Sequence, residues 1–193
     1  MYQQKMSLTI CMTFTAFMSL QAEGKLQNFW YGFHEVTPQK FYRSSQMPPD
    51  VLKKYVQRYG IKTVVNLRGK HEDAQWWIQE KKVADECSVE YVNIPMSCDT
   101  FPSKNNLVLL LAVYTFSQLP ILVHCKGGAE RSGEASAIWL LDHEHASKEE
   151  ALDQLSLKYW YIRFLHPAKR RFIELWQDGN WARHIYNPKN YSH

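Results

Sequence analysis

The chain has 193 residues, of which 45% are hydrophobic and 22% are charged, so it is long enough to bury a core as one domain. Its formal charge of +4 is mild and is spread along the chain, which does not indicate nucleic-acid binding. With no internal repeat and no low-complexity tract, we expect a single domain over residues 23–193, preceded by a separate N-terminal segment, 1–22.

The N-terminal segment resembles a secretory signal peptide. Lys5 precedes an apolar stretch from Met6 to Met18, and Ala22 is the residue after which cleavage is expected. We therefore predict export to the periplasm or the medium, with a cytoplasmic protein carrying a flexible N-terminus as the alternative. The stretch is shorter than the roughly 20 residues that a spanning helix needs, so no stable membrane span is expected.

Helical and strand patterns alternate along the rest of the chain. Helices are predicted at 50–59, 72–86, 107–116, 131–141 and 167–176, with one more after Ser147. Short apolar or β-branched runs predict strands at 63–67, 89–94 and 119–123. This alternation predicts an α/β fold with a mostly parallel central sheet flanked by helices, and a site at the carboxyl ends of the strands.

Two helix boundaries carry specific capping signals. Asp50 is a candidate cap for the first helix, and Gly60 is well placed to end it. Ser147 and Glu150 have the spacing of a capping box.

The most informative segment runs from His124 to Gly133, between a predicted strand and a predicted helix. In it, five residues separate Cys125 from Arg131. A loop that turns its backbone N–H groups inward and ends at a helix N-terminus forms a cradle for a tetrahedral oxyanion such as phosphate. Those amides and Arg131 favour the thiolate of Cys125, which is the nucleophilic form. We predict that Cys125 attacks phosphorus and that Arg131 binds two phosphate oxygens.

The neighbouring residues have supporting roles in this prediction. The expected phosphate-binding residues are Lys126, Gly127, Gly128, Ala129, Glu130 and Arg131. Ser132 is predicted to hydrogen-bond the Cys125 sulfur as a leaving group, and His124 to support the loop. Arg43 and Arg68 are expected near the same edge, where they either contact substrate or form structural ion pairs with nearby carboxylates.

The pattern His-Cys-x5-Arg-Ser resembles the signature of the cysteine-dependent protein tyrosine phosphatase superfamily. Segments 41–46, 60–69 and 154–156 are similar to parts of bacterial dual-specificity-like phosphatases, so the resemblance covers a core of about 41–178. It implies a dual-specificity phosphatase-like fold, catalysis through a phosphocysteine intermediate and no cofactor.

The reaction also needs a general acid, and the resemblance offers two candidates. Asp99 follows a predicted strand, where many dual-specificity phosphatases keep a mobile catalytic aspartate that closes over substrate. Glu130 lies inside the signature, where some relatives carry an aspartate that serves as the acid. We favour Asp99 and keep Glu130 as the alternative.

The remaining cysteines do not suggest a structural metal site. Cys11, Cys87 and Cys98 lack the paired Cys-x-x-Cys or Cys/His spacing of zinc ligands. Cys98 is interpreted first as a small buried hydrophobic residue, with a reversible disulfide to Cys125 as the alternative.

The substrate class follows from this chemistry only in part. We expect a phosphorylated protein, with phosphotyrosine favoured, and a phosphoinositide or inositol phosphate as the alternative. A rhodanese-like sulfurtransferase and a phosphate-binding pseudoenzyme are weaker hypotheses.

Overall fold

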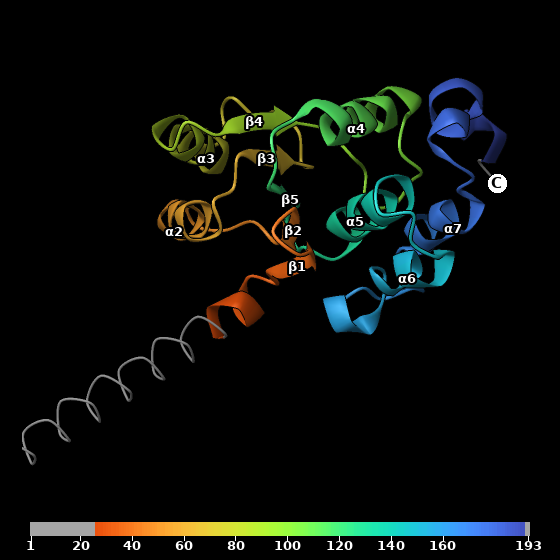
Figure 1. Ribbon diagram of the computed structural model, residues 1–193, viewed down its shortest axis with the longest axis horizontal. Helices are drawn as coiled ribbons and strands as arrows, with labels where there is room; N and C mark the ends of the chain where they lie inside the picture. The colour runs from red at the N-terminus through yellow and green to blue at the C-terminus, as the bar shows by residue number, and fades with distance from the viewer. Residues whose placement is uncertain (1–25, 192–193) are drawn as a thin grey trace, which may run out of the picture.

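The computed structural model describes residues 26–191, so the predicted signal segment and its cleavage point at Ala22 lie outside the described residues. Five strands form one sheet in the order β1-β2-β5-β3-β4. Their bounds are β1 His34–Thr37, β2 Phe41–Ser44, β3 Thr63–Asn66, β4 Glu90–Asn93 and β5 Ile121–His124. The prediction of a mostly parallel sheet flanked by helices is confirmed (Figure 1).

The strand register places the site. β5 is the central strand and pairs in parallel with both β2 and β3. His124, the last residue of β5, is level with Ser44 of β2 and with Asn66 of β3. All three strands therefore end together, and the chain leaves β5 at Cys125. The edge strand β1 was not predicted, and it runs antiparallel to β2.

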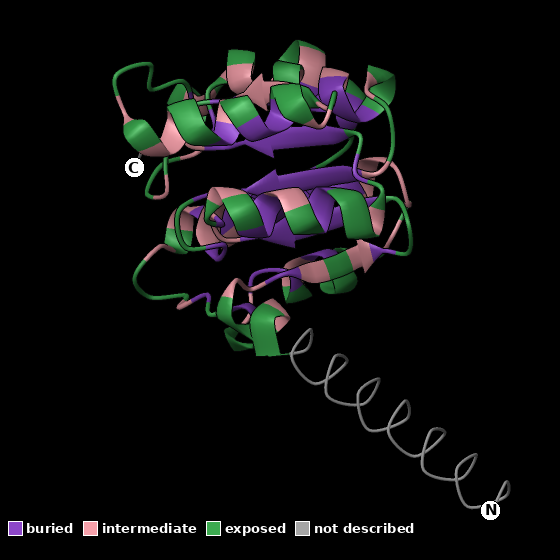
Figure 2. Cartoon of the chain, turned by 90° about the vertical axis from the view of Figure 1, so that its left-hand side faces the viewer, coloured by how far each residue is buried: buried purple, intermediate pink, exposed green. Residues whose placement is uncertain are grey.

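Helices cover both faces of the sheet. The bounds are α2 Pro49–Tyr59, α3 Gln75–Glu86, α4 Lys104–Phe116, α5 Glu130–Asp142, α6 Lys148–Asp153 and α7 Pro167–Leu175. In Figure 1, α2 and α3 lie on one side of the strands, and α4 to α7 lie on the other. The buried residues form two clusters accordingly, one around Val64 and Leu122 and one around Phe41 and Val123. The three inner strands, β2, β3 and β5, are wholly buried between these layers, and the edge strands β1 and β4 are partly exposed (Figure 2).

The helix termini confirm two of the three capping predictions. Ser147 and Glu150 form the complete capping box. Gly60 ends α2 in the left-handed region, with φ of 62°. The prediction for Asp50 is wrong, because α2 begins one residue earlier at Pro49, whose fixed φ suits the first position of a helix. Asp50 lies in the first turn, where its charge interacts favourably with the helix dipole.

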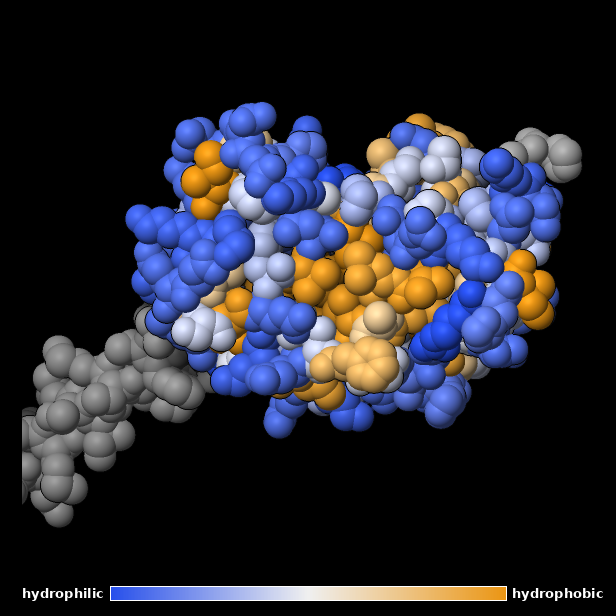
Figure 3. Space-filling model, turned by 90° about the horizontal axis from the view of Figure 1, so that it is seen from above, coloured by the Kyte–Doolittle hydropathy of each residue, from blue (hydrophilic) through white to orange (hydrophobic). Residues whose placement is uncertain are grey.

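The outer surface carries apolar residues. The face seen from above has an apolar area (Figure 3), and α4 lies on that side of the molecule in Figure 1. The exposed apolar residues of α4 include Leu109 and Phe116. Within residues 26–191, no helix has both the length and the apolar character that crossing a membrane requires.

Candidate active site

Cys125 lies at the bottom of the loop between β5 and α5. Its side chain is completely buried, and the backbone N–H of Gly128 donates to its sulfur over 3.2 Å. Glu130 opens α5, so the loop ends at the N-terminus of a 13-residue helix. The positive end of the helix dipole and the loop amides favour negative charge at this position.

The loop needs glycine at position 128. Its φ is +77°, and a Cβ there would lie 2.7 Å from the backbone nitrogen of Ser45 on the neighbouring strand connection. Gly127, in contrast, has an ordinary φ and nothing within 4 Å of the position of a Cβ. The close packing of Gly128 against the end of β2 therefore fixes the shape of the loop.

Arg43 supports the loop from below. Its guanidinium is fully buried and donates to the carbonyl oxygens of Gly128 at 2.8 Å, Ala129 at 3.1 Å and Gln154 at 2.7 Å. Arg43 therefore has a structural role. Its partners are carbonyl oxygens, whereas the sequence predicted carboxylates. A buried fork with several donors fixes the orientation of the loop peptides that follow Gly128.

Arg131 is placed to bind a ligand as predicted, whereas Ser132 has a different partner from the one predicted. Arg131 is partly exposed on the first turn of α5 and contacts the carbonyl oxygen of Leu67 at 3.5 Å, which leaves most of its donors free for a ligand. Ser132 is fully buried and donates to the carbonyl oxygen of Ser44 at 3.1 Å. The predicted bond from Ser132 to the Cys125 sulfur is replaced by this tie between α5 and β2.

The remaining phosphate-binding candidates lie within the loop between β5 and α5. Lys126 and Gly127 are exposed, whereas Gly128 and Ala129 are buried. Lys126 is therefore an exposed cation at the outer side of the loop.

His124 is part of a buried polar network behind the nucleophile. Its Nε2 lies 2.7 Å from Oε1 of Glu80, and both side chains are 3% exposed. The Tyr91 hydroxyl donates to the same carboxylate oxygen at 2.6 Å, and burial together with Glu80 raises the pKa of Tyr91. Asn66 in turn donates to Tyr91. This network fixes the orientation of the His124 ring directly before the nucleophile.

Arg68 follows β3 at the carboxyl end of the sheet, and its guanidinium packs against an aromatic ring. Its guanidinium carbon is 3.6 Å from the centroid of Trp76, and the side chain also donates to Gln46. Neither partner is a carboxylate.

The two candidate acids meet at a third residue, His166. The Nδ1 atom of His166 lies 2.7 Å from Oδ1 of Asp99, and its Nε2 atom lies 3.7 Å from Oε1 of Glu130. The Asp99 side chain is 66% exposed and that of Glu130 is 20% exposed, so Asp99 is freer to reach a bound substrate. Hydrogen bonds from the Cys98 thiol and from His166 lower the pKa of Asp99. Asp99 is therefore held as an anion and must leave these partners to carry a proton.

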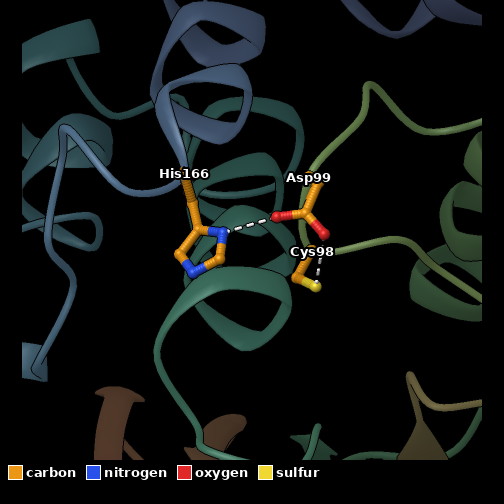
Figure 4. A group of neighbouring side chains, drawn as sticks. All are labelled: Cys98, Asp99 and His166. Atoms are coloured by element: carbon orange, nitrogen blue, oxygen red, sulfur yellow. Dashed lines mark hydrogen bonds and ion pairs between the residues drawn. The ribbon is translucent and has the colours of Figure 1, made fainter.

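The environment of Cys98 is more polar and more exposed than the sequence suggested. It is a free, partly exposed thiol whose sulfur lies 3.1 Å from Oδ2 of Asp99. The interpretation of Cys98 as a buried hydrophobic residue is wrong, because the loop turns its side chain toward the Asp99 carboxylate (Figure 4). Burial and the adjacent carboxylate raise the pKa of this thiol.

The loop that carries Asp99 is attached to the core by Lys169 of α7. The Lys169 ammonium donates to the carbonyl oxygen of Thr100 at 2.6 Å and to Glu134 of α5 at 2.9 Å. This residue, His166 and Glu80 were not singled out from the sequence. Lys169 stood in a basic cluster that is typical of a solvated helix face, and no spacing connects the other two to the signature.

A cleft of about 800 Å³ opens beside the Asp99 loop. Asp99, Phe101, Arg171 and Lys189 are among its lining residues. It combines apolar walls with two basic side chains, so it suits a ligand with an apolar body and further negative charge.

The sequence matches a family model of phosphatases. The family model described as a DSP-PTPase phosphatase fused to NAD+ kinase matches residues 20–163. The chain thus belongs to this family of dual-specificity-like phosphatases, within the cysteine-dependent protein tyrosine phosphatase superfamily. No curated protein sequence matches the chain significantly.

Solved structures share the fold at low sequence identity. The core catalytic domain of the PP-IP phosphatase Siw14 from S. cerevisiae is 19% identical, with 79% of this chain and 90% of that chain covered and a TM-score of 0.64. TpbA from P. aeruginosa is 20% identical over 79% and 89% of the two chains, with a TM-score of 0.59. PTPMT1 is 17% identical over 74% and 94%, with a TM-score of 0.53.

Proposed function

We propose that the protein hydrolyses phosphomonoesters through a phosphocysteine on Cys125, with phosphotyrosine and small aryl phosphates as the leading substrates. The observation that carries this proposal is the hydrogen bond from the Gly128 N–H to the buried Cys125 sulfur, in a loop that leads directly into α5. Among the solved structures of the same fold, TpbA has been determined with phosphotyrosine.

The reaction follows in two steps from these residues. The Cys125 thiolate attacks phosphorus, the bond from phosphorus to the ester oxygen breaks, and a general acid protonates the departing oxygen. Water then attacks the phosphocysteine, giving up a proton to the same residue, and inorganic phosphate leaves with the thiolate restored. Loop N–H groups and Arg131 bind the equatorial oxygens, where charge is concentrated in both transition states.

Asp99 is our candidate for the general acid, with Glu130 as the alternative. Asp99 is the more exposed carboxylate and belongs to a loop that can approach substrate. For this role it must exchange its contacts with His166 and Cys98 for a contact with the leaving oxygen. Glu130 needs no loop movement, but its carboxylate is directed toward the Nε2 side of His166.

Hydrolysis of para-nitrophenyl phosphate by the full chain under reducing conditions tests this function. Cys125→Ser should abolish turnover while phosphate still binds, and vanadate should block the unmodified enzyme. Arg131→Lys should lower kcat about 10²–10³-fold, because a lysine cannot form the two parallel hydrogen bonds. Undiminished turnover by Cys125→Ser would disprove the mechanism.

An inositol phosphate is the second candidate substrate. Lys126 on the loop, and Arg171 and Lys189 along the cleft, offer cations for phosphates other than the one that reacts. Siw14, of the same fold, is a PP-IP phosphatase. Under this alternative, the Lys126→Gln variant should lose kcat/KM for inositol polyphosphates and retain it for a phosphotyrosine peptide.

We also propose that the protein is exported, on the basis of the signal-like pattern between Lys5 and Ala22. The mass of the chain recovered from the producing cell tests this. A mature chain that begins at Glu23 supports export, and an intact Met1 in cytoplasmic extract contradicts it.

A further inference from the structure

Three side chains with the chemistry of metal ligands meet beside the catalytic loop. The Cys98 sulfur, a carboxylate oxygen of Asp99 and a ring nitrogen of His166 all lie within 4.8 Å of one another. Figure 4 shows the Asp99 carboxylate between the imidazole and the thiol, with one of its oxygens turned toward each. Two come from the loop after β4, and the third immediately precedes α7.

We propose that Cys98, Asp99 and His166 form a zinc site that inhibits the phosphatase. Binding of the metal does not depend on the proposed function, whereas the inhibitory effect of the metal rests on the proposed phosphatase activity. A thiolate, an imidazole and a carboxylate are the three donor types that zinc uses, and three protein ligands leave a fourth position for water.

The distances suit this metal. Ligand atoms around a tetrahedral zinc ion are about 3.3–3.6 Å apart, given metal–ligand bonds of about 2.0–2.3 Å. In the protein, the Cys98 sulfur is 3.1 Å from Asp99 Oδ2, and His166 Nδ1 is 2.7 Å from Asp99 Oδ1. Each of these two contacts holds a proton that zinc would replace, and each pair needs to separate by less than about 1 Å. The Cys98 sulfur and the His166 nitrogen lie within 4.8 Å of one another and need to come to about 3.5 Å.

The surroundings hold the ligands in place. Nε2 of His166 faces the Glu130 carboxylate at 3.7 Å, and a small approach would give the hydrogen bond from imidazole to carboxylate that orients histidine ligands in zinc proteins. The Tyr161 hydroxyl donates to the His166 carbonyl at 2.6 Å. On the other side, the Ser97 hydroxyl accepts from the backbone N–H groups of Asp99 and Thr100.

Binding of zinc has a direct consequence for turnover. The Cys98 thiol gives its proton to solvent, His166 releases the proton that Nδ1 shares with Asp99 so that this nitrogen binds the metal, and Asp99 binds as the carboxylate. Asp99 then cannot take up a proton or turn toward the leaving oxygen. Zinc also connects the Asp99 loop to the start of α7, so the loop cannot close over a substrate.

The first experiment measures binding without using activity. Cobalt(II) replaces zinc as a spectroscopic probe and is titrated into the full-length Cys125→Ser variant, which lacks the catalytic thiol. A thiolate-to-cobalt charge-transfer band is expected, and zinc should abolish it. The band should be lost on adding Cys98→Ser and should weaken with His166→Gln, whereas Cys11→Ser and Cys87→Ser should leave it unchanged. Absence of the band from Cys125→Ser, or its retention with Cys98→Ser, would overturn the site.

The second experiment measures inhibition. Zinc should inhibit para-nitrophenyl phosphate hydrolysis by the unmodified full chain, and a chelator should restore the rate. The inhibitory concentration should rise about 10–100-fold in Cys98→Ser and in His166→Gln, and remain unchanged in Cys87→Ser. Equal potency toward all four proteins would place zinc on Cys125 and refute the proposal. If the chain has no phosphatase activity, the cobalt spectra still decide whether the site exists.

Discussion

Lys169 of α7 and Glu134 of α5 form an ion pair of 2.9 Å in which neither side chain is exposed to solvent. Lys169 also donates to the carbonyl oxygen of Thr100, in the loop that carries the candidate acid Asp99. One buried cation thus joins the helix behind the catalytic loop to the loop that is expected to close on substrate. Burial of both charges is costly unless each is paired, so this contact is sensitive to substitution.

Removal of one member of the pair should destabilise the fold strongly. Lys169→Met leaves the Glu134 charge buried without its partner, and we expect a loss of about 3–5 kcal/mol in the free energy of unfolding at neutral pH or above. The double variant Glu134→Leu/Lys169→Met should regain much of this loss. Urea denaturation measures both, with Lys53→Met at the exposed Lys53–Glu86 pair as the matched control that should change little.

Glu134 should also make the stability depend on pH. Burial raises its pKa from 4.5 to about 7, against the opposing effect of Lys169. Because the folded protein holds this proton more tightly, the stabilisation is complete below pH 4.5 and is lost as the pH rises through about 7. The variant Glu134→Gln should therefore show a flatter dependence of the unfolding free energy on pH across this range. An unchanged slope would contradict the raised pKa.

A pair of glycine variants tests the shape of the catalytic loop. Gly128→Ala places a methyl group 2.7 Å from the Ser45 nitrogen in a backbone conformation with positive φ, and a strain of about 1–3 kcal/mol from the backbone alone is expected. The loop must shift, so vanadate affinity and turnover should both fall. Gly127→Ala meets open space and should leave both nearly unchanged. Equal effects of the two variants would argue against the close packing of Gly128.

The identity of the general acid can be tested with two substrates. Loss of the true acid should lower the rate on an alkyl phosphate about 10²–10⁴-fold, because its leaving oxygen needs a proton. The rate on para-nitrophenyl phosphate should fall far less, because that leaving group departs without one. We expect this pattern for Asp99→Asn and a smaller, substrate-independent effect for Glu130→Gln. The reverse result would assign the role to Glu130.

The catalytic loop is the part of this protein that could be predicted from its sequence. Cys125, Gly128 and Arg131 lie within seven consecutive residues between a strand and a helix, so their local order is enough to predict a phosphate-binding loop at this point. The capping box of Ser147 and Glu150 was equally local. Such features depend on the backbone conformation of one short segment, and the residue types in that segment determine it.

The contacts across the fold were decided only by tertiary structure. Asp99 and His166 are 67 residues apart, and Lys169 meets Thr100 across 69 residues. The antiparallel edge strand β1 and the position of Arg43 under the loop likewise depend on which segments the sheet brings together. Neither periodicity nor spacing encodes these encounters, because they arise when helices pack on the sheet and bring residues distant in sequence to one edge. The sequence therefore determined the nucleophile and its cradle, and the packing determined what surrounds them.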